Sequence, residues 1–408
     1  MQRGTSRCSR SCRGITMKKR LLPAFLIMPA LVIPVLVMLL AVVMASRPAE
    51  AATCATITKP KCRIQLLTGI SMTYLELGPT DGEAVILIHG LTDSARSWAP
   101  TMVALHRIDP KLHILAVDLR GHGTSSMPPI AACAAAPEKC FRMSDLAEDI
   151  KAFMQAKHIR KATLAGHSMG SFVAQEMALS YPEMVTRAIL VATSTRGVDN
   201  VALRDYVLKE PVEGSWRKAL EAKGKVYPED FYTIAPVKAD SDVRVWLAKN
   251  WVVDPVADPA FLKPYVPETA AVKLGTWIGA TKALLATDNT DRLKKLTVST
   301  LVIWGVQDNI FLNDPDQTAI KNVLRQAASQ QAPMFWKQYG SQPLPASGMQ
   351  EDDIGHNVQW GAPEEVAGDI DSFIRDGHPL PGLPHADAPA HLHRIVVDQN
   401  NALVEQWP

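Results

Sequence analysis

The sequence predicts an α/β fold: a mostly parallel, doubly wound sheet of eight strands with a helical segment inserted into it. Three observations lead to this prediction. Several apolar runs lack alternating polar residues, which is typical of strands buried on both faces of a parallel sheet. Amphipathic stretches separate these runs, as α/β layering requires. The strand pattern stops between residues 196 and 294 and then resumes.

Eight segments carry the strand pattern, and three well-formed helical patterns lie between or after them. The expected strands cover residues 63–67, 71–77, 84–90, 113–119, 162–168, 186–193, 300–305 and 334–340. The expected helices cover residues 143–158, 170–182 and 362–377. With 408 residues, the chain is long enough for one large or two modest domains.

The interruption divides the predicted sheet domain into two parts. Residues 53–195 form its first part, 196–294 a proline-rich and aromatic-rich helical cap, and 295–376 its second part. Residues 377–408 form a C-terminal extension. Its end alternates around two asparagines, which predicts a hairpin of unassigned purpose.

Residues 1–52 are expected to be a leader. Basic residues precede an uncharged apolar run over 21–45, and small residues in A-x-A-like order follow. This order is typical of an export signal, with cleavage after Ala45 or near Ala51–Ala52. The run is about as long as a membrane span, so an uncleaved anchor facing outside the cytoplasm is the alternative. We expect a secreted or periplasmic protein.

The charge of the chain is concentrated in this leader. The net charge is +2, but the leader holds eight Lys and Arg against one acid. The remainder has 35 basic and 40 acidic residues, so its net charge is near −5. This balance argues against a nucleic-acid partner.

The cysteines fall into local pairs. Cys54 with Cys62, and Cys133 with Cys140, remain after the leader. Close spacing and an even number in an exported chain predict two small disulfide loops. No second CxxC or clustered histidine accompanies either pair, so we expect no metal site.

One short stretch, LAGHSMGSF, concentrates the features of a reactive serine. Ser168 lies between Gly166 and Gly170, directly after an apolar strand and before a helix. Glycine at both positions permits a sharp turn, because side chains there would collide with the neighbouring strand and helix. The turn would hold the serine hydroxyl above the edge of the sheet.

A serine hydroxyl needs a base to take its proton and a third group to orient that base. Asp308 follows the apolar strand in LVIWGVQDN, and His356 lies in a loop before the closing helix. Carboxyl ends of strands are where an α/β sheet gathers such residues. We therefore expect Ser168 to act as nucleophile, His356 as base and Asp308 as its orienting acid. Asp352 and Asp353 are the alternative acids.

An acyl-transfer site also needs backbone N–H groups aimed at the developing oxyanion. We expect these from Met169, at the start of the helix after the serine, and from Leu91, after the strand that ends in His89-Gly90. His89 is expected to have a structural role. His167 and Trp98 are the candidates for substrate contact, and this chemistry requires no metal or organic cofactor.

Together these motifs resemble the α/β-hydrolase fold superfamily over residues 63–376. The motifs are HGLTDSARSW, DLRGHGTS, GHSMG, WGVQD and GHN. The resemblance implies the same roles for Ser168, Asp308 and His356 and a cap that acts as a lid. It also implies that Asp118 and Arg120 brace the loop next to the oxyanion site.

Departures from related patterns narrow the reaction. A serine nucleophile argues against haloalkane dehalogenases and epoxide hydrolases, which need aspartate. The absence of HGGG disfavours hormone-sensitive-lipase-like esterases, and GHSMG differs from the GGSWG of proline iminopeptidases. We expect hydrolysis of a small-molecule ester or lactone with an apolar part. The alternatives are carbon–carbon or amide hydrolysis with the same triad, and a non-catalytic binding protein.

Overall fold

A computed structural model describes residues 60–252, 254, 256–328, 332–340, 354–381, 394–397 and 403–406, the last two ranges by backbone alone. These residues belong to one compact unit that begins at Ala55. The leader, Cys54, Asp352 and Asp353 lie outside the described residues. None of the helices within these ranges is long and apolar enough to cross a bilayer.

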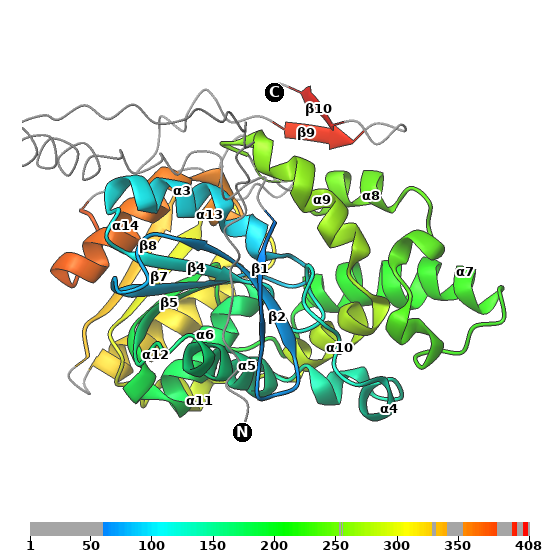
Figure 1. Ribbon diagram of the computed structural model, residues 1–408, viewed down its shortest axis with the longest axis horizontal. Helices are drawn as coiled ribbons and strands as arrows, with labels where there is room; N and C mark the ends of the chain where they lie inside the picture. The colour runs from blue at the N-terminus through cyan, green and yellow to red at the C-terminus, as the bar shows by residue number, and fades with distance from the viewer. Residues whose placement is uncertain are drawn as a thin grey trace, which may run out of the picture. The chain divides into compact units, whose positions relative to one another are not determined.

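An eight-stranded sheet forms the centre of the molecule, and each strand overlaps one of the eight expected segments (Figure 1). The strands are β1 (Cys62–Gln65), β2 (Ser71–Leu77), β3 (Ala84–Ile88), β4 (His113–Val117), β5 (Ala162–His167), β6 (Val185–Val191), β7 (Thr300–Gly305) and β8 (Met334–Tyr339). Every residue of β3, β4, β5 and β7 is buried, which explains their uninterrupted apolar sequences.

The strand order is β1-β2-β4-β3-β5-β6-β7-β8. Within this order the six strands β4-β3-β5-β6-β7-β8 pair in parallel, whereas β2 pairs antiparallel with both β1 and β4. The order reverses direction at β3, whose neighbours are β4 and β5. Loops after β3 and β5 therefore meet at the carboxyl edge of the sheet, where α/β folds bind ligands. The predicted fold class is confirmed.

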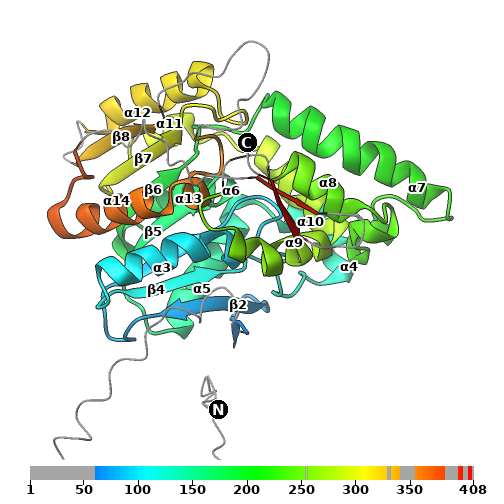
Figure 2. The same cartoon turned by 90° about the horizontal axis from the view of Figure 1, so that it is seen from above.

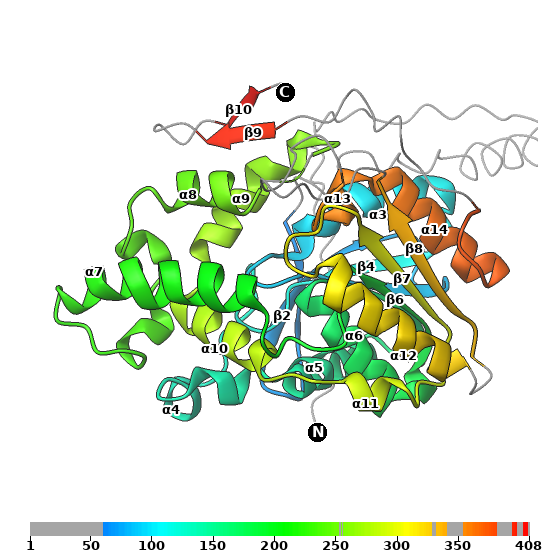
Figure 3. The same cartoon turned by 180° about the vertical axis from the view of Figure 1, so that it is seen from behind.

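Helices cover both faces of the sheet (Figures 1 and 3). On one face lie α3 (Ala99–Ile108), α13 (Val358–Gly361) and α14 (Pro363–Asp376). On the other lie α5 (Met143–Ala156), α6 (Met169–Ser180), α11 (Thr290–Leu293) and α12 (Thr318–Ala328). Short segments connect them: η2 (Ala95–Trp98), α4 (Ile130–Cys133), η3 (Pro137–Cys140), η4 (Pro182–Met184) and η9 (Asn313–Gln317).

Residues 196–294, which we call the insertion, are helical, and the part before α11 lies to one side of the sheet (Figure 2). Before α11 they form η5 (Ala202–Trp216), α7 (Arg217–Glu221), η6 (Asp230–Thr233), η7 (Pro236–Lys238), α8 (Val243–Asn250), η8 (Pro259–Phe261), α9 (Leu262–Ala271) and α10 (Leu274–Leu285). An antiparallel bridge between Arg196 and Asp288 holds the two ends of the insertion together. Beyond the core, β9 (Arg394–Val397) and β10 (Leu403–Gln406) form an antiparallel pair, as expected for a hairpin.

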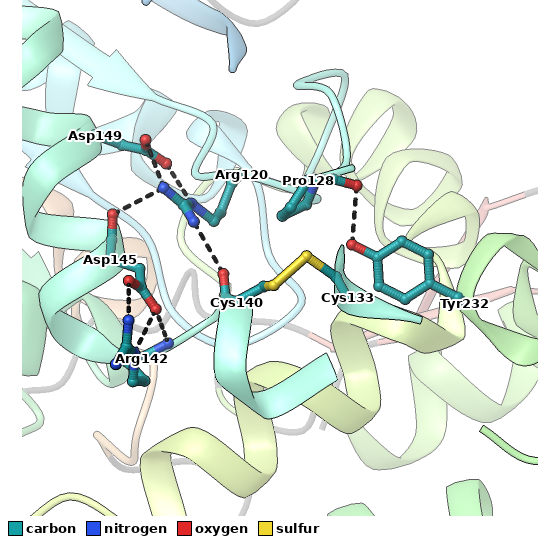
Figure 4. The surroundings of a disulfide bond; sticks show 8 residues. All are labelled: Arg120, Pro128, Cys133, Cys140, Arg142, Asp145, Asp149 and Tyr232. Atoms are coloured by element: carbon teal, nitrogen blue, oxygen red, sulfur yellow. Dashed lines mark hydrogen bonds and ion pairs between the residues drawn. A yellow bond between two sulfur atoms is a disulfide. The ribbon is translucent and has the colours of Figure 1, made fainter. Parts of the chain in front are cut away.

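A disulfide joins Cys133 to Cys140 in the excursion between β4 and α5, as the spacing predicts (Figure 4). The Arg120 guanidinium donates to the Cys140 carbonyl at 3.0 Å and pairs with the carboxylate of Asp149. From the insertion, the Tyr232 hydroxyl donates to the Pro128 carbonyl at 3.0 Å. The excursion thus braces the base of the insertion against the core.

Candidate active site

Ser168 occupies a sharp turn between β5 and α6. Its backbone has φ 51° and ψ −123°, a left-handed conformation that non-glycine residues rarely adopt. A Cβ on Gly166 would lie 2.1 Å from the Gly170 carbonyl oxygen, and one on Gly170 would lie 2.3 Å from that of Ile88. Both glycines are therefore required for the backbone to close around the serine, as the sequence predicts.

His356 and Asp308 are brought together over the end of β7. The imidazole Nδ1 donates to Asp308 Oδ1 at 2.9 Å. Backbone N–H groups of Ile310 and Phe311 also donate to Oδ1, at 2.8 and 3.0 Å, so the carboxylate is fixed in position. A Cβ on Gly305 would lie 2.1 Å from the Gly355 carbonyl oxygen, which explains why residue 305 is a glycine.

The hydrogen bond to Asp308 determines the protonation chemistry of His356. With Nδ1 donating to a carboxylate, the neutral imidazole keeps its lone pair on Nε2, where a proton can be accepted. Burial disfavours the charged imidazolium, but the carboxylates of Asp308, Asp254 and Asp93 outweigh it and raise the pKa of His356 above its ordinary value. The ring is thus a stronger base than an isolated histidine.

Ser168 and His356 line one cavity of about 630 Å³. In the part of the chain that the structure describes, no hydrogen bond joins their side chains. Catalytic hydrogen bonds in unliganded enzymes are often long and tighten when substrate binds. The residue before the serine, His167, also lines the cavity, and its Nε2 donates to the His356 carbonyl at 3.0 Å.

The two expected oxyanion donors lie next to Ser168. Met169 is the first residue of α6, where N–H groups have no partner inside the helix. Leu91 lines the cavity, and the preceding Gly90 approaches the serine so closely that a Cβ there would lie 3.1 Å from Ser168 Cβ. The backbone of this loop therefore passes directly beside Ser168.

Buried polar groups hold in place the loop after β3, which carries Leu91. Asp118 Oδ1 accepts from the Ala95 N–H at 2.7 Å, and the same carboxylate binds Lys61. His89 Nε2 accepts from the Leu119 N–H, so its Nδ1 donates to the Gly90 carbonyl. Burial lowers the pKa of His89 to about 4, which keeps the ring neutral. The geometry gives Asp118 and His89 structural positions, as expected for both.

The insertion supplies more than half of the residues that line the cavity. Its lining residues are Ala202, Leu203, Tyr206, Val207, Glu210, Pro211, Ser215, Trp246, Lys249, Asn250, Trp251 and Asp254. Most other aromatic residues of the insertion are buried among themselves, as core packing predicts. The placement of Trp98 has to be corrected. Its side chain is fully buried in η2 and is not among the lining residues, because η2 turns it into the core.

Two carboxylates that sequence reasoning missed also line the cavity. Asp93 and Asp254 are each only 3% exposed. Asp93 Oδ1 accepts from the hydroxyl of Tyr265, and burial raises the pKa of Asp93 to about 6. Burial likewise raises the pKa of Asp254, although the His356 charge and bonds from Asn357 oppose this. The only sequence signal for Asp93 is its place in HGLTD, and Asp254 has none.

A metal ion would need several ligating side chains gathered in one place. Across the described ranges, no group of three or more His, Cys, Asp or Glu side chains is arranged to hold one. The cavity instead brings together a serine, a histidine with an orienting carboxylate, and backbone N–H groups, a set that suits acyl transfer.

Comparison with known proteins gives partial matches of moderate identity. Residues 83–360 match the family model described as alpha/beta hydrolase fold. A 3-oxoadipate enol-lactonase of Acinetobacter baylyi is 22% identical over 59% of this chain and 77% of its own length. An epoxide hydrolase of Caenorhabditis elegans is 27% identical over 30% of this chain. The chain spans about a third of the length of that relative and of two others.

Solved structures reproduce the fold at low identity. The enol-lactonase of Burkholderia xenovorans aligns with a TM-score of 0.51 at 18% identity, covering 76% of this chain and 99% of that one. An esterase of Exiguobacterium antarcticum aligns with a TM-score of 0.54 at 18% identity, covering 77% and 98%. The family match covers well over half of the sequence, and these structures share its architecture. The chain belongs to the α/β-hydrolase fold family.

Proposed function

We propose that the protein is an exported serine hydrolase that cleaves a carboxylic ester or lactone with an apolar part. The observation that carries the proposal is the strained turn at Ser168 in the same cavity as a histidine oriented by Asp308. Enol-lactonases and esterases among the relatives favour an acyl substrate, and the aromatic side chains of Tyr206, Trp246 and Trp251 offer it apolar surface.

The reaction would proceed through an acyl-enzyme. Ser168 Oγ attacks the carbonyl carbon while His356 Nε2 takes its proton, and Asp308 stabilises the resulting imidazolium. The N–H groups of Leu91 and Met169 bind the oxyanion. His356 then returns the proton to the leaving alkoxide, which departs as an alcohol. A water molecule, deprotonated by the same histidine, attacks the acyl-enzyme, and collapse of the second intermediate releases the acid and restores Ser168.

Export is proposed from two features. The leader combines basic residues, an apolar run and small residues. The Cys133–Cys140 disulfide fits an oxidising compartment. Sequencing the N-terminus of the protein recovered from outside the cytoplasm tests this: a start near residue 46 or 52 is expected, and an intact leader in the membrane fraction would support an anchor instead.

Labelling with a fluorophosphonate probe tests the catalytic assignment. The wild-type protein should be labelled once, and Ser168→Ala should abolish labelling and esterase activity. A panel of p-nitrophenyl esters, lactones and a ring-fission dienoate then separates bond types. Activity confined to the dienoate would replace ester by carbon–carbon hydrolysis. A folded wild-type protein that neither labels nor turns over any member would point to a binding protein.

A further inference from the structure

Asp254, which belongs to the insertion, binds the loop that carries His356. Its Oδ1 accepts from the His356 N–H at 3.1 Å. Its Oδ2 accepts from the Asn357 N–H at 3.1 Å and from the Asn357 side-chain amide at 2.5 Å. About a hundred residues of sequence separate the carboxylate from these three donors.

The fit between carboxylate and loop is close. A Cβ on Gly355 would lie 1.8 Å from Asp254 Oδ1, so the carboxylate occupies the space that any other residue at 355 would fill. The Asp254 side chain is almost completely buried, and among the described residues its charge is balanced by N–H donors of the loop rather than by a lysine or arginine. Buried bonds to a charged acceptor of this kind are stronger than neutral ones.

We propose that Asp254 is a positioning residue for the acyl transfer assigned to this site: through the main chain of residues 356 and 357 it holds the His356 imidazole in place. The inference rests on the proposed function. Asp308 fixes the ring at Nδ1, and Asp254 fixes the backbone from which the ring projects. Because Asp254 comes from the insertion, docking of the insertion and alignment of the base become one event. Substrate enclosure by the insertion is thereby coupled to completion of the triad.

Asp254 has a second, electrostatic effect on the base. The groups that face the His356 ring are Asp308, Asp254 and Asp93, which favour the imidazolium, together with the neutral rings of His167 and Phe311. Removing one negative charge lowers the pKa of His356. The acid limb of the pH profile of kcat/KM, where His356 becomes protonated, then moves to lower pH.

The test uses the variant Asp254→Asn in the full-length protein, with p-nitrophenyl butyrate as substrate and active sites counted by fluorophosphonate labelling. We expect kcat to fall at least tenfold with KM within threefold of wild type, and the acid limb to move to lower pH. The matched control is Asp242→Asn, an exposed carboxylate at the start of α8 whose loss should change neither value. An unchanged kcat, or a lower kcat with an unmoved acid limb, would overturn the proposal.

A second variant decides the matter if Asp254→Asn fails to fold. Asn357→Ala removes one donor to Asp254 and leaves its charge in place. We expect kcat to fall severalfold while the acid limb stays where it is, and wild-type kcat would contradict the inference. Failure of the proposed function looks different: the wild-type protein itself would then hydrolyse no ester and take up no probe.

Discussion

At the sheet edge, Gly166 and Gly170 let the backbone carry Ser168 into the cavity, whereas the insertion reaches the same cavity through side chains. The tight contacts of the turn at Ser168 are with backbone atoms: Gly166 meets Gly170, and Gly170 meets Ile88 at the end of the neighbouring strand β3. Asp254 and Tyr265 instead meet partners roughly 100 and 170 residues away. The setting of Ser168 is therefore determined by backbone contacts at the glycines of its own motif, while the setting of His356 depends on side chains that the insertion docks against its loop.

Ion pairs also join the insertion to the core. Glu268 on α9 binds Lys61 and Arg96, and Lys61 also binds Asp118, so one nearly buried network joins the insertion to the loop that carries Leu91. Breaking one member of such a network leaves uncompensated buried charge. The insertion is thus tied both to the loop that carries His356 and to the loop that carries Leu91.

The largest expected effect is a loss of activity when Asp308 is replaced. Comparing it with the loss in Asp254→Asn decides whether the core or the insertion supplies the acid that orients His356. Asp308→Asn should lower kcat by about 10³- to 10⁴-fold, because an amide no longer selects the Nδ1–H tautomer of His356. Steady-state hydrolysis of p-nitrophenyl butyrate measures it. A greater loss in Asp254→Asn than in Asp308→Asn would reverse the division between the two regions, since the insertion would then supply the principal carboxylate.

The next effect contrasts one glycine from each region. Gly170→Ala places a Cβ 2.3 Å from the Ile88 carbonyl oxygen, and this backbone cannot move aside, so we expect unfolding free energy to fall by more than about 4 kcal/mol. A Cβ in Gly224→Ala, in the insertion, meets open space, and the alanine only has to adopt a left-handed φ of +75°. We expect this variant to lose about 1 kcal/mol of unfolding free energy. Chemical denaturation measures both. Similar losses in the two variants would show that the turn at Ser168 is not sterically determined.

The contrast between local and distant contacts also explains which parts of the molecule the sequence predicts. All eight strands and the pairing of His356 with Asp308 could be expected, because uninterrupted apolar runs and motifs at strand ends are local signals. The expectation for Trp98 is wrong because the direction of a side chain in a short helical segment depends on what packs around it. Asp254 and Tyr265 escape prediction because their partners are distant in sequence, and no periodicity marks such residues.

Loss of the Cys133–Cys140 disulfide should have an intermediate effect, felt mainly by the insertion. In Cys133→Ser/Cys140→Ser, opening the short loop should lower unfolding free energy by about 2 to 3 kcal/mol. The excursion contacts the insertion through Tyr232 and, from Thr276, a 3.1 Å bond to the Gly121 carbonyl. We expect the double variant to exchange amide hydrogens faster than wild type, and this acceleration to be greater in α10 than in β5. Equal acceleration in both would show that the disulfide stabilises the core as much as the insertion.

The weakest effect concerns a wall to which both regions contribute. Asp93 from the core and Asp254 from the insertion are buried carboxylates in the cavity. The charged lining residues Lys249 and Glu210 are exposed, and their charges are opposite to each other. Among the described lining residues there is no buried lysine or arginine. An acyl chain ending in a carboxylate would therefore be repelled near the scissile carbonyl, in a medium that screens charge poorly.

The p-nitrophenyl hemiester of succinate, compared with p-nitrophenyl butyrate, isolates this charge because a carboxylate replaces a methyl group. At about pH 8 we expect kcat/KM to be at least about tenfold lower for the hemiester, or about 1.4 kcal/mol. Asp93→Asn should reduce the ratio of kcat/KM for p-nitrophenyl butyrate to kcat/KM for the hemiester. The neutral methyl ester of the hemiester serves as the control for polarity. Asp93 has a pKa raised to about 6, so it gains a proton below that pH and the discrimination should weaken. The substrate carboxylate, with an ordinary pKa of about 4.3, stays charged at about pH 5.5. A ratio that is independent of both pH and Asp93 would locate the selection elsewhere, in the exposed residues of the insertion rather than in the wall it shares with the core.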